Sequence, residues 1–191
     1  MSFLSNIRHR LVTAPLKTLR FWREERGTAT IEFVLTVPIF LVLVTSAVEL
    51  GVALTRHVML DRGLDVAVRQ VRLGQIDTAD TATYYTELKQ AICDNAFIIP
   101  DCINQLKLEM IRVDPLNWTG VPAVPDCIDR DDPAAAARGF VRGQRNQLMV
   151  LRACALFDPL YPTTGIGASI PRASGDAFAL VSTASFVIEP I

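Results

Sequence analysis

The chain has 191 residues, 50% of them hydrophobic, and a formal net charge of −1. This length suits one domain with an anchor and leaves little room for a second independent core. The near-neutral charge argues against a nucleic-acid binder, which would need a basic surface. Six basic and two acidic residues within 1–27 leave residues 28–191 with a formal charge of −5. A basic leader before an acidic body predicts a cytoplasmic N-terminus and a body on the other side of a membrane.

The first predicted element is a transmembrane helix over residues 28–50. No charged residue occurs in 33–48, and about 20 mainly apolar residues suffice to cross a bilayer as a helix. Pro38 is expected to kink it. Glu49 is placed at the far interface, whereas Glu32 lies in or near hydrocarbon, where an ionisable group is costly and usually functional. A secretory signal peptide fits poorly, because its apolar core is shorter and follows a shorter basic region.

The boundary between leader and helix carries a second signal. Gly27 ends the basic leader 1–27, and Glu32 and Phe33 follow after four small or apolar residues. A cut after Gly27 would make Thr28 the new N-terminus, and a glycine lets the backbone open into a protease cleft. The Thr28 amine, on the same or a neighbouring subunit, is a ready partner for the Glu32 carboxylate in a low dielectric. This order is what a prepilin-type peptidase needs; the alternative is an uncleaved signal anchor.

Together with Pro38 and the exit sequence Val48-Glu49-Leu50-Gly51, the stretch from Gly27 to Leu35 resembles the TadE-like family. These are minor pilins or pseudopilins of the tight-adherence (Tad or Flp) type IV pilus. The resemblance is strongest over residues 20–73. It implies cleavage after Gly27 by a prepilin peptidase and a role in building or initiating the fibre.

The same resemblance implies the partners and the location. The partners would be the inner membrane, the prepilin peptidase, other pilins and pilus-assembly proteins, without nucleic acid, small-molecule substrate or cofactor. The protein would be single-pass in the inner membrane, with its C-terminal domain in the periplasm. Phe33 stands where the major pilins tend to have Tyr, which favours the pseudopilin side. An uncleaved periplasmic scaffold or binding protein is the alternative function.

The helix is predicted to continue outside the membrane over residues 51–73. Apolar residues recur there at three- and four-residue spacings among charged ones, which is typical of an amphipathic helix. Gly74 is the expected C-cap, and Gly63 is expected to be a weak point. One helix would thus serve as both anchor and spine.

Residues 74–191 are predicted to form an extracytoplasmic α+β domain, in which a small three-stranded, mainly antiparallel sheet packs on the long helix. Asp77, with Asp80, is expected to cap a second helix that ends near Asn95. Its apolar stripe would be Ala82, Tyr85, Leu88 and Ile92. Strands are expected over 106–110, over 146–157 at the centre of the sheet, and over 178–188.

A long irregular insertion over residues 114–145 contains four prolines and three glycines. Long loops of this kind are usually functional or disordered. Trp118 within it is interpreted as a lid on the core rather than as a partner contact.

Four cysteines follow the anchor, where disulfides persist, and four cysteines allow three connectivities. Proximity favours Cys93–Cys102 and Cys127–Cys154. A zinc site is the alternative, but the spacings lack a CxxC pair and no histidine lies nearby.

An acidic cluster surrounds Cys127 in the sequence and consists of Asp126, Asp129, Asp131 and Asp132. Calcium is the alternative ligand of this cluster, but the glycine and glutamate of a calcium loop are missing, so a solvated acidic loop and no metal are expected. No catalytic motif occurs in the chain either, so the sequence predicts no enzyme.

Overall fold

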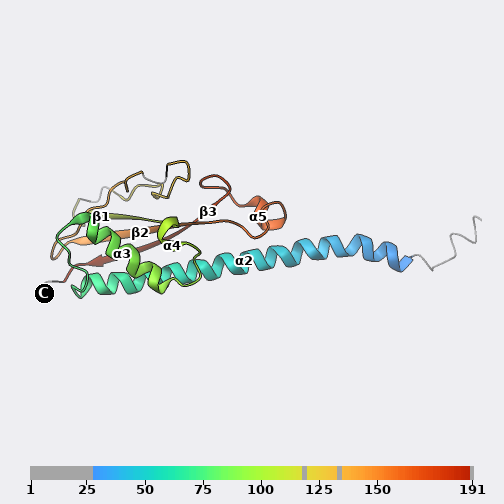
Figure 1. The fold of residues 1–191 in the computed structure, drawn as a ribbon, viewed down its shortest axis with the longest axis horizontal. Helices are drawn as coiled ribbons and strands as arrows, with labels where there is room; N and C mark the ends of the chain where they lie inside the picture. Colours follow the sequence, from blue (N-terminus) through green and yellow to red (C-terminus); the bar gives the residue numbers. More distant parts are fainter. Residues whose placement is uncertain (1–27, 118–119, 133–134, 190–191) are drawn as a thin grey trace, which may run out of the picture. The chain divides into compact units, whose positions relative to one another are not determined.

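The computed structural model describes residues 28–117, 120–132 and 135–189. The chain divides into two compact units, residues 1–44 and 45–191, and the long helix contributes to both. The leader 1–27, with Gly27, and Trp118 in the insertion lie outside the described residues. The elements, in chain order, are α2 (Thr28–Arg72), α3 (Thr81–Asn95), α4 (Cys102–Gln105), β1 (Leu106–Val113), β2 (Leu148–Phe157), α5 (Gly165–Ser169) and β3 (Phe178–Val187) (Figure 1).

The N-terminal part of α2 is apolar and exposed. Among the described residues, α2 is the one helix long and apolar enough to cross a membrane, and its most apolar stretch is 0% buried, with a mean hydropathy of 2.3. Pro38 lies inside the helix. An apolar helical stretch that stays this exposed among the described residues requires another apolar environment, such as lipid.

The C-terminal part of α2 belongs to the core of the second unit. Its buried residues include Leu60, Leu64 and Ala67. The helix ends at Arg72, and Gly74 follows with a φ of +67°, which glycine readily adopts. The Gln75 N–H donates to the Gln70 carbonyl at 2.9 Å, which satisfies one of the last free acceptors of the helix. The predicted C-cap is confirmed.

The sheet has the order β1-β2-β3, and both pairs are antiparallel. The predicted α+β class and the central position of β2 are therefore confirmed. Side chains alternate between the two faces of a strand, and the two faces differ in composition. One face joins the helices in an apolar core made of Leu106, Leu108, Met110, Met149, Leu151, Ala153, Ala155 and Phe186. The other face carries Lys107, Glu109, Arg152 and Cys154.

The second helix, α3, is capped by Asp80 and not by Asp77. The Asp80 carboxylate accepts a hydrogen bond from the Thr83 N–H at 2.8 Å, while Asp77 forms an ion pair with Arg142. The prediction was wrong because either aspartate could cap a helix in this stretch, and the helix begins only at Thr81.

The buried stripe of α3 is Tyr84, Leu88 and Ile92, so it differs by a few positions from the predicted one. Ala82 is exposed, and Tyr85 is half-buried. Moving the cap from Asp77 to Asp80 places the first turn, including Ala82, outside the core.

Gly63 marks a close approach between α2 and α3 rather than a weak point. A Cβ added at Gly63 would lie 2.6 Å from the Ile92 carbonyl oxygen and 3.2 Å from the Ala96 Cβ. Real Cβ atoms do not approach a backbone oxygen so closely. Glycine is therefore used here because it brings the two helices together.

The outer edge of β1 is occupied by the chain itself. The Leu108 N–H donates to the Tyr85 hydroxyl at 3.3 Å, and the Val141 N–H donates to the Met110 carbonyl at 2.9 Å. Burial raises the pKa of Tyr85 above its ordinary value, so the hydroxyl stays protonated at neutral pH. Both contacts satisfy edge groups of β1 that no strand pairs.

Candidate functional site

The predicted processing segment lies at the N-terminal end of the described part of α2. Thr28 is its first residue. Glu32 is exposed and forms no hydrogen bond or ion pair with another residue that the structure describes. Phe33 is 66% exposed. Both side chains are thus available to something other than the folded chain. Because Gly27 lies outside the described residues, the cleavage site itself stays a prediction.

Glu49, at the other end of the apolar run, is fully engaged. Its side chain is buried, with the residue 1% exposed, and its two carboxylate oxygens accept the N–H groups of Leu160 at 3.1 Å and Tyr161 at 2.9 Å. Ser46, one turn earlier, accepts the Ile166 N–H at 3.3 Å. Sequence reasoning missed this contact because the partners are backbone groups more than a hundred residues away, which leave no signal in the sequence.

An apolar stripe continues along α2 after the exit from the run. Leu50, Leu54 and Val58 are 43%, 55% and 60% exposed and follow each other at four-residue spacing, so they lie on one helical face. The core of the domain uses other positions of the helix, such as Leu60 and Leu64. The helix therefore has one apolar face inside the domain and a second apolar face outside it.

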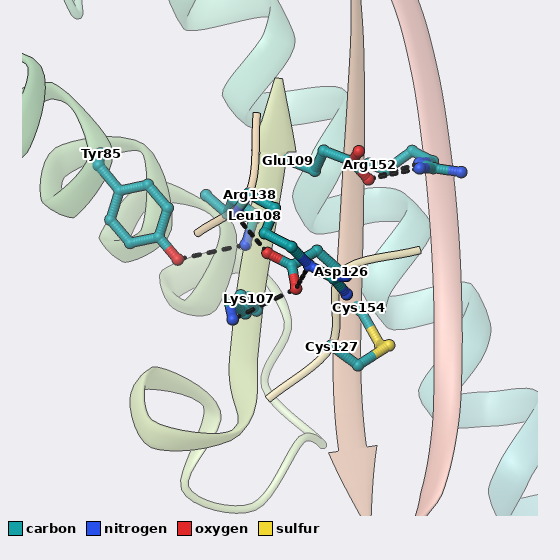
Figure 2. A network of polar contacts seen from close by, with 9 residues as sticks. All are labelled: Tyr85, Lys107, Leu108, Glu109, Asp126, Cys127, Arg138, Arg152 and Cys154. Atoms are coloured by element: carbon teal, nitrogen blue, oxygen red, sulfur yellow. Dashed lines mark hydrogen bonds and ion pairs between the residues drawn. A yellow bond between two sulfur atoms is a disulfide. The ribbon is translucent and has the colours of Figure 1, made fainter. Parts of the chain in front are cut away.

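The 114–145 insertion is fixed to the charged face of the sheet by Asp126 (Figure 2). The Asp126 carboxylate lies 3.3 Å from the Lys107 Nζ and accepts hydrogen bonds from the Arg138 Nε at 3.1 Å and N–H at 2.6 Å. Asp126 is only 4% exposed, so the prediction of a solvated acidic loop is wrong for this residue. The two cations on either side explain why the carboxylate can be buried.

The protonation of Asp126 follows from opposing influences. Burial alone would raise its pKa, but the hydrogen bonds from Arg138 and Lys107, and the charge of Lys107, together hold the pKa below its ordinary value. The carboxylate is therefore charged at neutral pH.

A second buried ion pair lies on the same face of the sheet (Figure 2). The Arg152 Nε donates to the Glu109 Oε2 at 2.9 Å, and the Arg152 Nη1 donates to the Pro122 carbonyl at 2.6 Å. Arg152 thus joins the central strand both to β1 and to the insertion. Since each of these charges has a close partner, the arrangement serves to hold the insertion in place.

Both disulfides have the predicted pairing. Cys93 is bonded to Cys102 and Cys127 to Cys154, with Cα–Cα distances of 5.7 and 5.2 Å. The first joins the end of α3 to α4, and the second joins the insertion to the central strand. No cysteine is left free, so all four sulfur atoms are used in these two bonds.

The described residues contain no group of three or more His, Cys, Asp or Glu side chains that could hold a metal ion. Within the acidic cluster, the Asp129 carboxylate accepts the Asp131 N–H at 3.0 Å.

One cluster contains the residue types of a hydrolytic triad in an unsuitable order. The Ser182 hydroxyl donates to the Asp61 carboxylate, and the His57 Nε2 lies 3.7 Å from the other oxygen of that carboxylate. Because Asp61 stands between them, His57 is not hydrogen-bonded to the serine and cannot take its proton.

The fold and these contacts define a class of protein: an α+β domain built on a helix whose N-terminal part can cross a membrane. A family model described as TadE-like protein matches residues 27–69. The predicted TadE-like resemblance is thereby confirmed over this segment, which covers the exposed apolar run and most of the helix inside the domain. The match indicates a protein associated with the Tad pilus. Neither a curated protein nor a solved structure matches the chain.

Proposed function

We propose that this chain is a minor pilin or pseudopilin that acts in the assembly of a Tad-type (Flp) pilus. A prepilin peptidase cuts it after Gly27 on the cytoplasmic side. The mature chain then spans the inner membrane once, with its domain in the periplasm, and its partners are other pilins and pilus-assembly proteins. Its role is structural and not enzymatic.

One observation carries this proposal. The segment that matches the TadE-like model, residues 27–69, runs from the predicted cut through the exposed apolar run into the core of the domain. A plain signal anchor does not require its helix to continue into a sheet-covered core. A subunit that is pulled from the bilayer into an oligomer does, because the helix must transmit that movement to the domain.

The free-energy cost of placing the Glu32 carboxylate in a membrane supports an assembly role. A carboxylate inside a span is expensive unless it is paired, and Glu32 has no ion-pair partner among the described residues. After cleavage, the α-amino group of Thr28 on the same or a neighbouring subunit supplies the opposite charge. The exposed stripe of Leu50, Leu54 and Val58 then gives the neighbouring helix an apolar surface on the periplasmic side.

The test of processing is N-terminal sequencing of the protein extracted from membranes. We expect Thr-Ala-Thr-Ile-Glu in a strain with an active prepilin peptidase, and an intact leader in Gly27→Val. The matched control is Gly51→Val, since a Cβ at exposed Gly51 meets nothing within 4 Å, and this variant is expected to be cut normally. An intact Met1 in the wild-type protein would support the alternative, an uncleaved signal-anchored periplasmic scaffold or binding protein.

A further inference from the structure

The segment between β2 and β3 has an unusual composition for an exposed loop. Residues 159–171 contain no charged side chain, although they connect two strands at the surface of the domain. Leu160 is 51% exposed and Tyr161 is 39% exposed. Asp158 and Arg172 are the nearest charged residues on either side. We call residues 159–171 the β2–β3 loop.

The β2–β3 loop is attached to α2 near the C-terminal end of the apolar run. Its backbone N–H groups bind Glu49 and Ser46, which lie where the apolar run ends. Residues 28–48 measure about 31 Å at about 1.5 Å per residue, which is close to the roughly 30 Å hydrocarbon thickness of a bilayer. The loop is therefore attached to α2 at the level where hydrocarbon gives way to headgroups.

The same contact removes the charged Glu49 carboxylate from the surface at the end of the apolar run. Glu49 is the first acidic residue after the apolar run, and the loop buries it completely. Two backbone N–H donors replace the water that its carboxylate loses, which compensates the desolvation. In exchange, the domain presents Leu160 and Tyr161 to its surroundings instead of a carboxylate.

The loop is also held in a compact shape. The Arg172 guanidinium donates to the carbonyls of Pro162 and Gly167, and it lies 4.6 Å from the centre of the Phe178 ring. A Cβ at Gly167 would lie 2.2 Å from the Tyr161 carbonyl oxygen. The charge at this end of the loop thus serves to fix the loop.

We propose that the β2–β3 loop lies on the bilayer interface, with Leu160 and Tyr161 inserted among the lipids of the leaflet on the side of the domain. Tyrosine is favoured there because its ring is apolar and its hydroxyl reaches the headgroups. The loop holds the domain against the membrane before assembly. This inference rests on the membrane-spanning role of α2 that forms part of the proposed function.

The experiment uses the full chain in vesicles of phosphatidylcholine brominated high on the acyl chain. The two native tryptophans, Trp22 and Trp118, are first replaced by Phe. Single tryptophans are then introduced as Leu160→Trp, as Phe40→Trp within the apolar run, and as Leu73→Trp. Leu73 is a matched control because it is also 51% exposed and directly follows the end of α2, about 36 Å beyond Glu49 at about 1.5 Å per residue.

We expect bromine to quench the fluorescence of Leu160→Trp and Phe40→Trp and to leave that of Leu73→Trp nearly unchanged. Adding Glu49→Ala, which releases the loop, should reduce the quenching at position 160 and leave that at position 40 intact. Quenching at position 40 without quenching at position 160 overturns this inference alone. Absence of quenching at position 40 overturns the membrane-spanning role as well.

Discussion

Two carboxylates bracket the same apolar run of α2, and they lie in opposite situations. Glu49 is buried and accepts two backbone N–H groups from the β2–β3 loop. Glu32 is exposed and makes no such contact with any residue in the described part of the chain. The residue type and the helix are the same, so the difference comes from what the rest of the chain offers each side chain.

The difference separates folding from assembly. Glu49 has its hydrogen-bond donors inside the domain, so substitution of Glu49 should lower the free energy of unfolding. Glu32 has no hydrogen-bond or ion-pair partner among the described residues, so substitution of Glu32 should weaken contacts with other chains. Asp126, a third carboxylate, extends the comparison because it is buried between two cations.

The largest loss is expected for Asp126→Ala. It leaves the buried Lys107 without its counter-ion and the Arg138 N–H without its acceptor, and breaking a buried ion pair costs about 3–5 kcal/mol. Urea unfolding of the full chain in detergent, followed by near-ultraviolet circular dichroism, measures it. The matched control is Asp131→Ala, an exposed aspartate of the same insertion, for which about 0.5 kcal/mol or less is expected. Equal losses in both variants would show that the Asp126 pairs contribute nothing.

Asp126 also predicts a dependence on pH. Its pKa in the folded protein is lower than its ordinary value of 3.8, so its contribution is fully present above that value and is lost as the pH falls through the folded pKa. Urea midpoints measured downward from pH 5 should therefore fall, and Asp126→Asn should give a shallower fall. An unchanged slope in the variant would mean that other carboxylates carry the acid sensitivity.

A smaller loss is expected for Glu49→Ala. The variant leaves the N–H groups of Leu160 and Tyr161 without an acceptor, and an unsatisfied buried donor costs about 1–3 kcal/mol, less where water can enter. The same urea titration measures it, and hydrogen exchange at these two amides should accelerate. Amides that exchange as slowly as in the wild-type protein would contradict the contact with Glu49.

The smallest loss, about zero, is expected for Glu32→Ala, because no described contact is removed. Cleavage after Gly27 and insertion should also be unchanged. In contrast, crosslinking of the processed protein to other pilus components and the formation of pili should decrease strongly. If Glu32→Ala and the wild-type protein crosslink equally and support equal piliation, Glu32 has no role in assembly and the proposed assembly mechanism is wrong.

The parts of the fold that the sequence predicts well depend on short-range signals. The end of α2 at Gly74 follows from a glycine after an amphipathic run, and the pairing of Cys93 with Cys102 follows from proximity along the chain. The central strand follows from a stretch that is apolar on both faces apart from Arg152. In each case the determining residues lie near each other in the sequence.

The parts that it does not predict depend on distant partners. The burial of Asp126 requires contacts with Lys107, which precedes it in the sequence, and Arg138, which follows it. A cluster of four aspartates alone is more typical of a solvated loop. The contact of Glu49 involves backbone N–H groups, which any residue could supply. Asp77 and Asp80 are both suitable caps by residue type, and in the structure Asp80 caps α3 while Asp77 pairs with the distant Arg142.

The closed edge of β1 has a consequence for crowding. An exposed strand edge offers unpaired N–H and C=O groups to any neighbouring strand, which is a common route to aggregation. The Tyr85 hydroxyl and the backbone of Val141 occupy this edge in the folded chain. Wherever many copies of the domain are confined to one membrane, the Leu108 N–H and the Met110 carbonyl are therefore not available to a strand of a neighbouring copy.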